Sequence, residues 1–306
     1  MRDSTPRPHR LTVTHEHGER VRIAAGGVEI ACYEYAPDVP AFEGPKPYLH
    51  PVRTLSGGLV TGYRPNDHRW HKGIQMTWTD VSGQNFWGGN TYVHGSGYVP
   101  LDNVGSIRHD SFAVIDLTPE DLSLDEELSW LTSTGETWIA ERRRLRVHGV
   151  DVERGTWVLD AVIELRNVRG AELRLGSPTT KGRPNAGYTG FFWRGPRAFT
   201  GGAIHTPDGG GQEAMGTSSA WLAFTGEHDD VDGGATLLVI AGTSSHGKPA
   251  WFVRSEPFPG VAPAPAFHEV IVLPPQDVLR LHHRIVIADR IWTREEIERA
   301  ATEHAL

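Results

Sequence analysis

The chain has 306 residues, a formal net charge of −8 and a pI near 6.0. Its 30 Lys and Arg residues form no extended tract apart from residues 142–144, which argues against a nucleic-acid partner. The longest apolar run, residues 236–241, is far shorter than the roughly 20 residues that a membrane helix needs, and residues 1–8 lead into no apolar export signal. The single cysteine, Cys32, excludes an internal disulfide and fits a reducing compartment, so we expect a cytoplasmic protein.

Glycine and proline, with 35 and 21 residues respectively, occur throughout the chain and separate short β-branched runs. This pattern is typical of many turns and strands and not of long helices. Because all-β sandwiches often exceed 200 residues as one unit, we predict a single large antiparallel β-sandwich domain over residues 1–306.

The predicted elements follow in chain order. A meander over 11–14, 20–23 and 28–35 turns at Gly26–Gly27, where glycine reaches positive φ. Thr118–Asp121 resembles a helix start, although 122–130 is ambiguous. A hairpin pairs 137–147 with 156–168, since the second segment alternates apolar and polar residues with a period of two.

The later strands are expected at 220–225, 235–242, 269–273 and 278–287. A C-terminal helix over about 293–304 is predicted by the capping box of Thr293 and Glu296. Two glycine- and proline-rich loops, 201–216 and 257–265, are expected to border a pocket or an interface.

The stretch from Tyr48 to His94 concentrates the residues that can carry chemistry. We expect a group of proton carriers, metal ligands and orienting or charge-stabilising side chains there and in a later polar loop: His50, Asp67, His68, His71, Lys72, Asp80, His94 and Lys181. In Asp67-His68-x-x-His71, the three-residue spacing places both imidazoles on one side of a turn. The alternative is that these histidines only bond to loop carbonyls.

Aromatic and amide side chains are interleaved with this group. Residues expected to stack on a sugar or bond to its hydroxyls are Trp70, Trp78, Asn85, Trp87, His246 and Arg254. The simpler interpretation is that the tryptophans only fill the hydrophobic core. A divalent metal such as Zn, Mn, Fe or Co is possible only if a further ligand joins the two imidazoles, for instance His50, His94, His246 or His268. Nucleotide-binding glycine motifs and a Gly-x-Ser-x-Gly elbow are absent from the sequence.

The chain resembles the bacterial DUF6807 family, also called the PmoA family. The resemblance lies in Tyr48-x-His50-Pro51, Asp67-His68-x-x-His71-x-Gly73, Trp78-x-Asp80-Val81-x-Gly83 and Phe86-Trp87, with looser agreement at Trp251-x-Val253-Arg254. It covers most of the chain and implies a supersandwich similar to galactose-mutarotase-like proteins, in the context of carbohydrate catabolism.

These observations favour an enzyme acting on a sugar or glycoside. The favoured reaction is a lyase-type elimination from a 3-keto-glycoside, with His68 or His71 as base or metal ligand. His50 and His94 would be further ligands or an acid, Asp67 and Asp80 would orient them, and Lys72, Lys181 or Arg254 would stabilise an oxyanion. The alternatives are a sugar epimerase or mutarotase, and a non-catalytic carbohydrate-binding protein.

Overall fold

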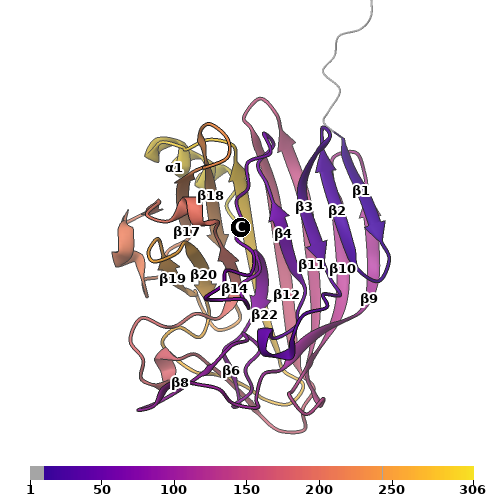
Figure 1. Ribbon diagram of the computed structural model, residues 1–306, viewed down its shortest axis with the longest axis vertical. Helices are drawn as coiled ribbons and strands as arrows, with labels where there is room; N and C mark the ends of the chain where they lie inside the picture. Colours follow the sequence, from indigo (N-terminus) through magenta and orange to yellow (C-terminus); the bar gives the residue numbers. More distant parts are fainter. Residues whose placement is uncertain (1–9, 243) are drawn as a thin grey trace, which may run out of the picture.

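The computed structural model describes residues 10–242 and 244–306. Residues 1–8, where the absence of an export signal was predicted, lie outside the described part. Two large antiparallel sheets pack face to face (Figure 1), which confirms the predicted all-β sandwich. The first sheet contains, in spatial order, β1 (Leu11–Glu16), β2 (Arg20–Ala25), β3 (Val28–Glu34), β4 (Tyr48–Val52), β5 (Ile74–Thr77), β14 (Gly190–Arg194), β20 (Gly260–Ala264) and β19 (Ala250–Arg254).

The second sheet carries the long central hairpin. Its spatial order is β16 (Gly209–Gly210), β15 (Ala203–Thr206), β17 (Trp221–Glu227), β18 (Gly234–Ala241), β22 (Val278–Ala288), β12 (Thr156–Asn167), β11 (Thr137–Asp151), β10 (Leu122–Leu131) and β9 (Ser106–Leu117). The smaller elements are the sheet β21 (Ile271–Leu273), β13 (Leu173–Gly176) and β6 (Asp80–Val81), the hairpin β7 (Thr91–Val93) and β8 (Gly97–Val99), and the 3-10 turns η1 (Ala41–Glu43), η2 (Thr179–Lys181), η3 (Arg197–Phe199) and η4 (Gly211–Ala214).

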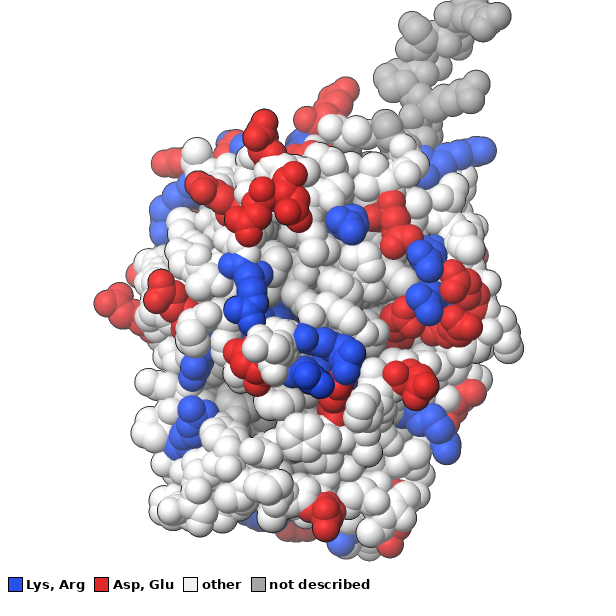
Figure 2. Space-filling view, viewed as in Figure 1, with Lys and Arg blue, Asp and Glu red and all other residues white. Residues whose placement is uncertain are grey.

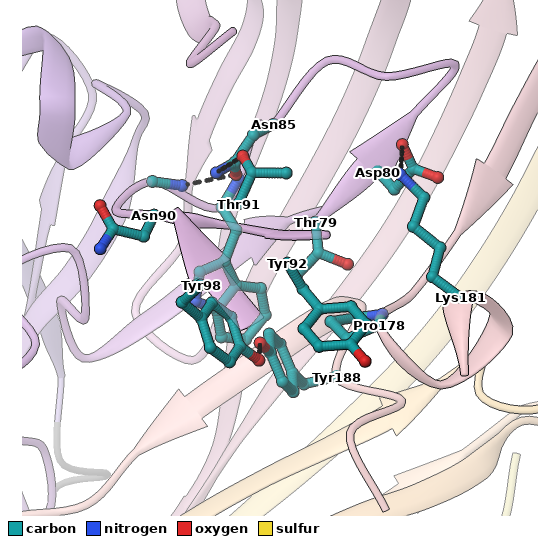
Figure 3. A pocket seen from close by; sticks show the side chains of 12 residues that line it. Thr79, Asp80, Asn85, Asn90, Thr91, Tyr92, Tyr98, Pro178, Lys181 and Tyr188 are labelled. Carbon is teal, nitrogen blue, oxygen red and sulfur yellow. Dashed lines mark hydrogen bonds and ion pairs between the residues drawn. The ribbon is translucent and has the colours of Figure 1, made fainter. Parts of the chain in front are cut away.

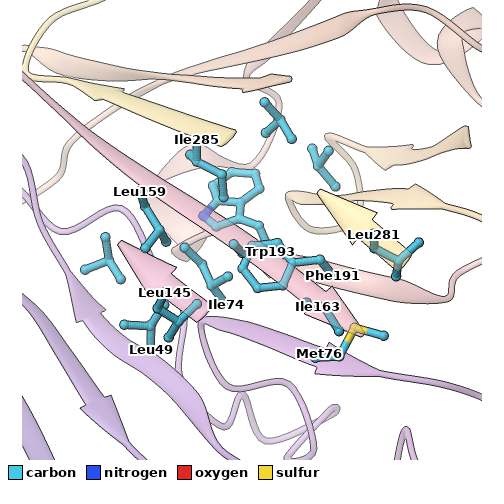
Figure 4. Close-up of a cluster of buried hydrophobic side chains, with 14 of the residues drawn as sticks. Leu49, Ile74, Met76, Leu145, Leu159, Ile163, Phe191, Trp193, Leu281 and Ile285 are labelled. Atoms are coloured by element: carbon cyan, nitrogen blue, oxygen red, sulfur yellow. The ribbon is translucent and has the colours of Figure 1, made fainter. Parts of the chain in front are cut away.

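The hydrophobic core lies between the two sheets. Figure 4 shows apolar side chains of β4, β5 and β14 meeting those of β11, β12 and β22. On β12 the predicted apolar face, from Trp157 to Leu165, is at most 1% exposed. Period-two alternation therefore places every second side chain in the core, as the sequence predicts.

The C-terminal helix α1 (Arg294–Glu303) covers the outer face of the second sheet. Ile297, Ala300 and Ala301 pack in one cluster with residues of β17, β18 and β22, which explains why β18 is apolar on both faces. The capping box is present, because Thr293 accepts from the Glu296 amide and Glu296 accepts from the Thr293 amide. The predicted helix is confirmed.

The predicted meander, the central hairpin and the later strands are also confirmed in type and approximate bounds. The predicted helix start at Thr118–Asp121 is wrong. This segment is a turn that leads into β10, where Leu122, Leu124, Leu128 and Trp130 are buried. Pairing with β9 on one side and β11 on the other satisfies the β10 backbone and overrides its local helical character. No helix in the described residues is both long and apolar enough to cross a membrane.

Candidate functional site

A cleft lies where β14 and β19 of the first sheet approach loops 64–72 and 85–90 and the β7–β8 hairpin. Its main cavity has a volume of about 330 Å³, within the size range of small-molecule sites. The cavity is lined by His68, Trp70, His71, Trp87, Gly88, Asn90, Tyr98, Arg183, Tyr188, Phe192, Phe252, Arg254, Pro257 and Phe258. The last two belong to the segment 257–265, which was expected to be a loop that borders a pocket; residues 260–264 of it form strand β20 instead, and only its first part reaches the cavity. A narrower recess (Figure 3) adjoins the cavity and shares with it Trp87, Gly88, Asn90, Tyr98 and Tyr188.

The loop that carries the two histidines is anchored at both ends by one buried carboxylate. Glu43, 2% exposed, accepts two hydrogen bonds from Arg64, at 2.6 and 2.9 Å, and forms an ion pair with Lys72 at 3.0 Å. The Lys72 ammonium is 1% exposed, and burial lowers its pKa although Glu43 opposes the shift. Burial alone would raise the pKa of the Glu43 carboxyl, but its contacts with Arg64 and Lys72 outweigh burial and lower that pKa. Lys72 does not line the cavity and acts as an anchor of the loop, which corrects its expected role as an oxyanion stabiliser.

His71 is fixed in one neutral form. It is 3% exposed, and its Nδ1 lies 3.0 Å from Arg194 Nη1. Because a guanidinium can only donate, Nδ1 must accept, so the proton of the neutral ring sits on Nε2. Burial, assisted by the positive charges of its neighbours, holds the pKa of His71 well below its ordinary value. His71 is therefore a neutral hydrogen-bond donor in the wall of the cavity.

His68 stands beside His71, with ring centroids 4.8 Å apart. Its Nδ1 is 3.1 Å from the Asp67 carboxylate, an ion-pair contact that is not aligned as a hydrogen bond. Burial lowers the pKa of His68, and Asp67 partly opposes this shift. A neutral His68 whose Nδ1 faces Asp67 can leave Nε2 free as a base.

Trp87 joins the two sides of the cavity. Its ring lies 5.7 Å from the His71 ring and 4.7 Å from the Tyr188 ring. Asn85 does not reach the main cavity. It shapes the turn beneath, because its Oδ1 accepts from the amides of Trp87 and Gly88. At Gly88, φ is +97° and a Cβ would lie 2.5 Å from the Glu43 carbonyl oxygen, so the close approach of η1 to this turn requires glycine.

The recess beside the cavity ends in a salt bridge. Lys181 Nζ lies 2.9 Å from Asp80 Oδ1, and the two side chains point toward each other in Figure 3. Asp80 also accepts from the Gly83 amide at 2.9 Å. These two predicted residues thus lie in the same cleft as the histidines but in its narrow part.

Four predicted residues lie elsewhere. His50 stacks on Tyr63, with centroids 4.8 Å apart, and its Nδ1 contacts the Thr61 hydroxyl at 2.9 Å. Burial, followed by the charge of Arg53, lowers its pKa to about 4. His94 and His246 are exposed in turns and line neither part of the cleft. Trp78 is fully buried and donates Nε1 to the Gly176 carbonyl, so its predicted stacking role is corrected: a ring with no exposed surface cannot touch a ligand.

Of the four histidines considered as one group, only His68 and His71 line the cavity, whereas His50 and His94 line neither part of the cleft. Over residues 10–242 and 244–306, no three His, Cys, Asp or Glu side chains are grouped closely enough to hold a metal ion.

Several residues of the cleft were not predicted. Tyr98, Arg183, Tyr188 and Phe258 line the cavity, and Arg194 supports His71 from behind. Arg183 and Tyr188 belong to a polar loop that contains Lys181, which is a weak sequence signal. Arg194 ends the buried strand β14, and nothing in its sequence neighbourhood distinguishes it from a surface residue.

A comparison with curated proteins gave no match. A family model, described as a family of unknown function, DUF6807, matches residues 20–302. This match includes the whole second sheet, the first sheet except β1, and every residue that lines the cleft. The chain therefore belongs to the DUF6807 family.

Proposed function

We propose that this protein is an enzyme that acts on a sugar-sized carbonyl compound by moving a proton next to the carbonyl group. The observation that carries the proposal is the pairing of His68 with a neutral, tautomerically fixed His71 in the wall of a cavity of about 330 Å³. Aromatic rings supply most of the remaining lining, as expected where a sugar face stacks. The lowered pKa of His68 keeps it unprotonated near neutral pH, which a base requires.

The favoured reaction is elimination from a 3-keto-glycoside. The ketone acidifies the proton on C2, which His68 removes through Nε2. Meanwhile His71 donates its Nε2–H to the ketone oxygen as negative charge develops there. The C2 electron pair then forms the C1–C2 double bond and expels the C1 oxygen substituent. The proton held by His68 passes to the departing oxygen, which restores the neutral base.

The test is release of nitrophenol from a 4-nitrophenyl 3-keto-glucoside. We expect turnover by the wild type and a loss of roughly a hundredfold or more in kcat for His68→Gln and for His71→Gln. His246→Gln is the matched control, because this exposed residue lies outside the cleft, and it should retain the wild-type rate.

The other outcomes discriminate between functions. Solvent deuterium entering C2 with the glycosidic bond intact would indicate an epimerase, which needs the same base without a leaving group. Saturable sugar binding with no turnover and no exchange would contradict the enzyme proposal and favour a carbohydrate-binding protein.

A further inference from the structure

The main cavity has an unbalanced charge. Arg183 and Arg254 line it, whereas none of its lining residues is Asp or Glu. In the adjoining recess Asp80 is already neutralised by Lys181. Among the described residues, neither lining arginine has a carboxylate within salt-bridge distance; Arg183 instead donates to the Tyr98 hydroxyl at 2.5 Å. This local excess of positive charge occurs in a chain whose net charge is −8.

A third arginine, Arg194, adds positive charge behind the wall of the cavity. Arg194 is 2% exposed, forms no ion pair with the described residues, and has an unpartnered Nε. Its guanidinium lies 4.0 Å from the centroid of Phe258 and contacts His71, both of which line the cavity. Burial lowers its pKa to about 10, with the carboxylate of Asp67 opposing the shift. Keeping such a charge out of water without a counterion is costly.

The two lining arginines also act on each other. The pKa of Arg254 is lowered first by burial and then by the charge of Arg183, while Tyr188 and Tyr98 oppose the shift. The Tyr98 and Tyr188 hydroxyls contact each other, and the Tyr98 ring lies under Arg183, 4.9 Å from its Cζ. On the face of the molecule that Figure 2 draws, Lys and Arg side chains gather near the middle and a group of acidic side chains lies above them, so charges of opposite sign are separated on this surface.

We propose that the cavity takes an anionic sugar, whose carboxylate or phosphate oxygens are held by Arg183 and Arg254. Guanidinium groups bind such oxygens through charge-assisted hydrogen bonds. Trp87 connects this part of the wall to the histidines, through its contacts with Tyr188 and His71. The sugar ring then lies over the aromatic residues with its charged group at the arginines and its reactive carbon at the histidines. As a statement about substrate class this inference rests on the proposed function, but the binding step requires no turnover.

Isothermal titration of the wild-type protein tests the inference with four probes: D-glucuronate, D-gluconate, glucose 6-phosphate and D-glucose. We expect at least one anion to bind roughly tenfold or more tightly than glucose, because hydrogen bonds to charged groups exceed neutral ones by that order. A preference for glucuronate or gluconate identifies a carboxylate, and a preference for glucose 6-phosphate identifies a phosphate.

The variants Arg183→Gln and Arg254→Gln should each weaken the preferred anion by roughly tenfold to a hundredfold and leave glucose unchanged. Arg280→Gln is the matched control, because Arg280 is exposed on β22 and pairs with Glu164 away from the cleft. Equal binding of glucose and all three anions, no detectable binding of any anion, or unchanged anion affinity in both cavity variants would overturn the inference.

The proposed reaction and the proposed anion site can each be rejected without rejecting the other. Turnover of a neutral 3-keto-glucoside without any anion preference would retain the proposed enzyme and reject the anionic substrate. Anion binding that depends on both arginines, with no turnover of any keto-sugar, would retain the anion site and reject the proposed reaction.

Discussion

Glu43→Gln tests whether one buried carboxylate holds the histidine loop. The change removes the counterion of Lys72, which is 1% exposed, and weakens the paired hydrogen bonds from Arg64. Removing one partner of a buried ion pair typically costs about 3–5 kcal/mol, because the other charge stays buried. For a chain of this length we expect a decrease of roughly 5–8 °C in Tm.

The assay is urea unfolding at pH 7, with thermal unfolding as a second measure. Glu164→Gln is the control, because Glu164 pairs with Arg280 at the surface, and surface pairs contribute only about 0–1 kcal/mol. The double variant Glu43→Gln with Lys72→Met should recover part of the loss, since it removes the stranded ammonium. A Glu43→Gln protein within about 1 kcal/mol of the wild type would refute the reasoning.

The loss of stability in Glu43→Gln should depend on pH. The pKa of Glu43 is lowered in the folded protein, so its stabilising contribution is complete above the unfolded pKa of about 4.3. The contribution is lost as the pH falls below that value and through the folded pKa. The difference in unfolding free energy between wild type and Glu43→Gln should therefore shrink below about pH 4.

Three further predictions concern the core and the site. His283→Phe should reduce the loss of stability in acid. Burial lowers the pKa of His283 to about 3, so the wild type loses unfolding free energy as the pH falls from 6.5 toward 3. The loss should be on the order of 3 kcal/mol by pH 4.5, measured by urea unfolding. Arg194→Met should raise the pKa of His71 and mix its two tautomers, observed in the ¹⁵N NMR shifts of the ring, because a positive neighbour and the donor to Nδ1 are both lost. Trp78→Ala should cost about 3–5 kcal/mol as a core truncation, whereas Trp70→Ala, in the cavity wall, should cost less and impair ligand binding.

The control for Arg194→Met uses an exposed arginine. Arg197→Met, whose side chain is 71% exposed, should leave the His71 ring shifts unchanged. Equal acid lability of wild type and His283→Phe would contradict the first prediction. Unaltered ring shifts in Arg194→Met would contradict the second, and greater destabilisation by Trp70→Ala than by Trp78→Ala would contradict the third.

Local patterns in the sequence predicted much of the fold. The alternation from Trp157 to Leu165 predicted a strand with one face in the core, and the capping box at Thr293 predicted the start of α1. The error at Thr118–Asp121 has a physical origin. A turn followed by regularly spaced leucines can suit a helix or a strand, and only the partners β9 and β11 select the strand.

The sequence could predict those parts of the site whose residues are close together along the chain. His68 and His71 are close in the sequence and therefore close in space. Lys72 follows His71 directly, yet it contacts Glu43 while His71 lines the cavity. Trp78 and Trp87 have the same residue type in the same region, and only packing separates a core ring from a cavity ring.

The sequence by itself determined an antiparallel β protein with a C-terminal helix and a polar, aromatic histidine segment, because side-chain periodicity, capping and turn chemistry act over a few residues. The tertiary structure decided that Tyr98, Arg183 and Arg254 join His68 and His71 in one cavity, that Arg194 fixes the tautomer of His71, and that His50 and His94 line no part of the cleft. These contacts join strands and loops far apart along the chain, so they follow from how the sheets and their loops pack and not from spacing in the sequence.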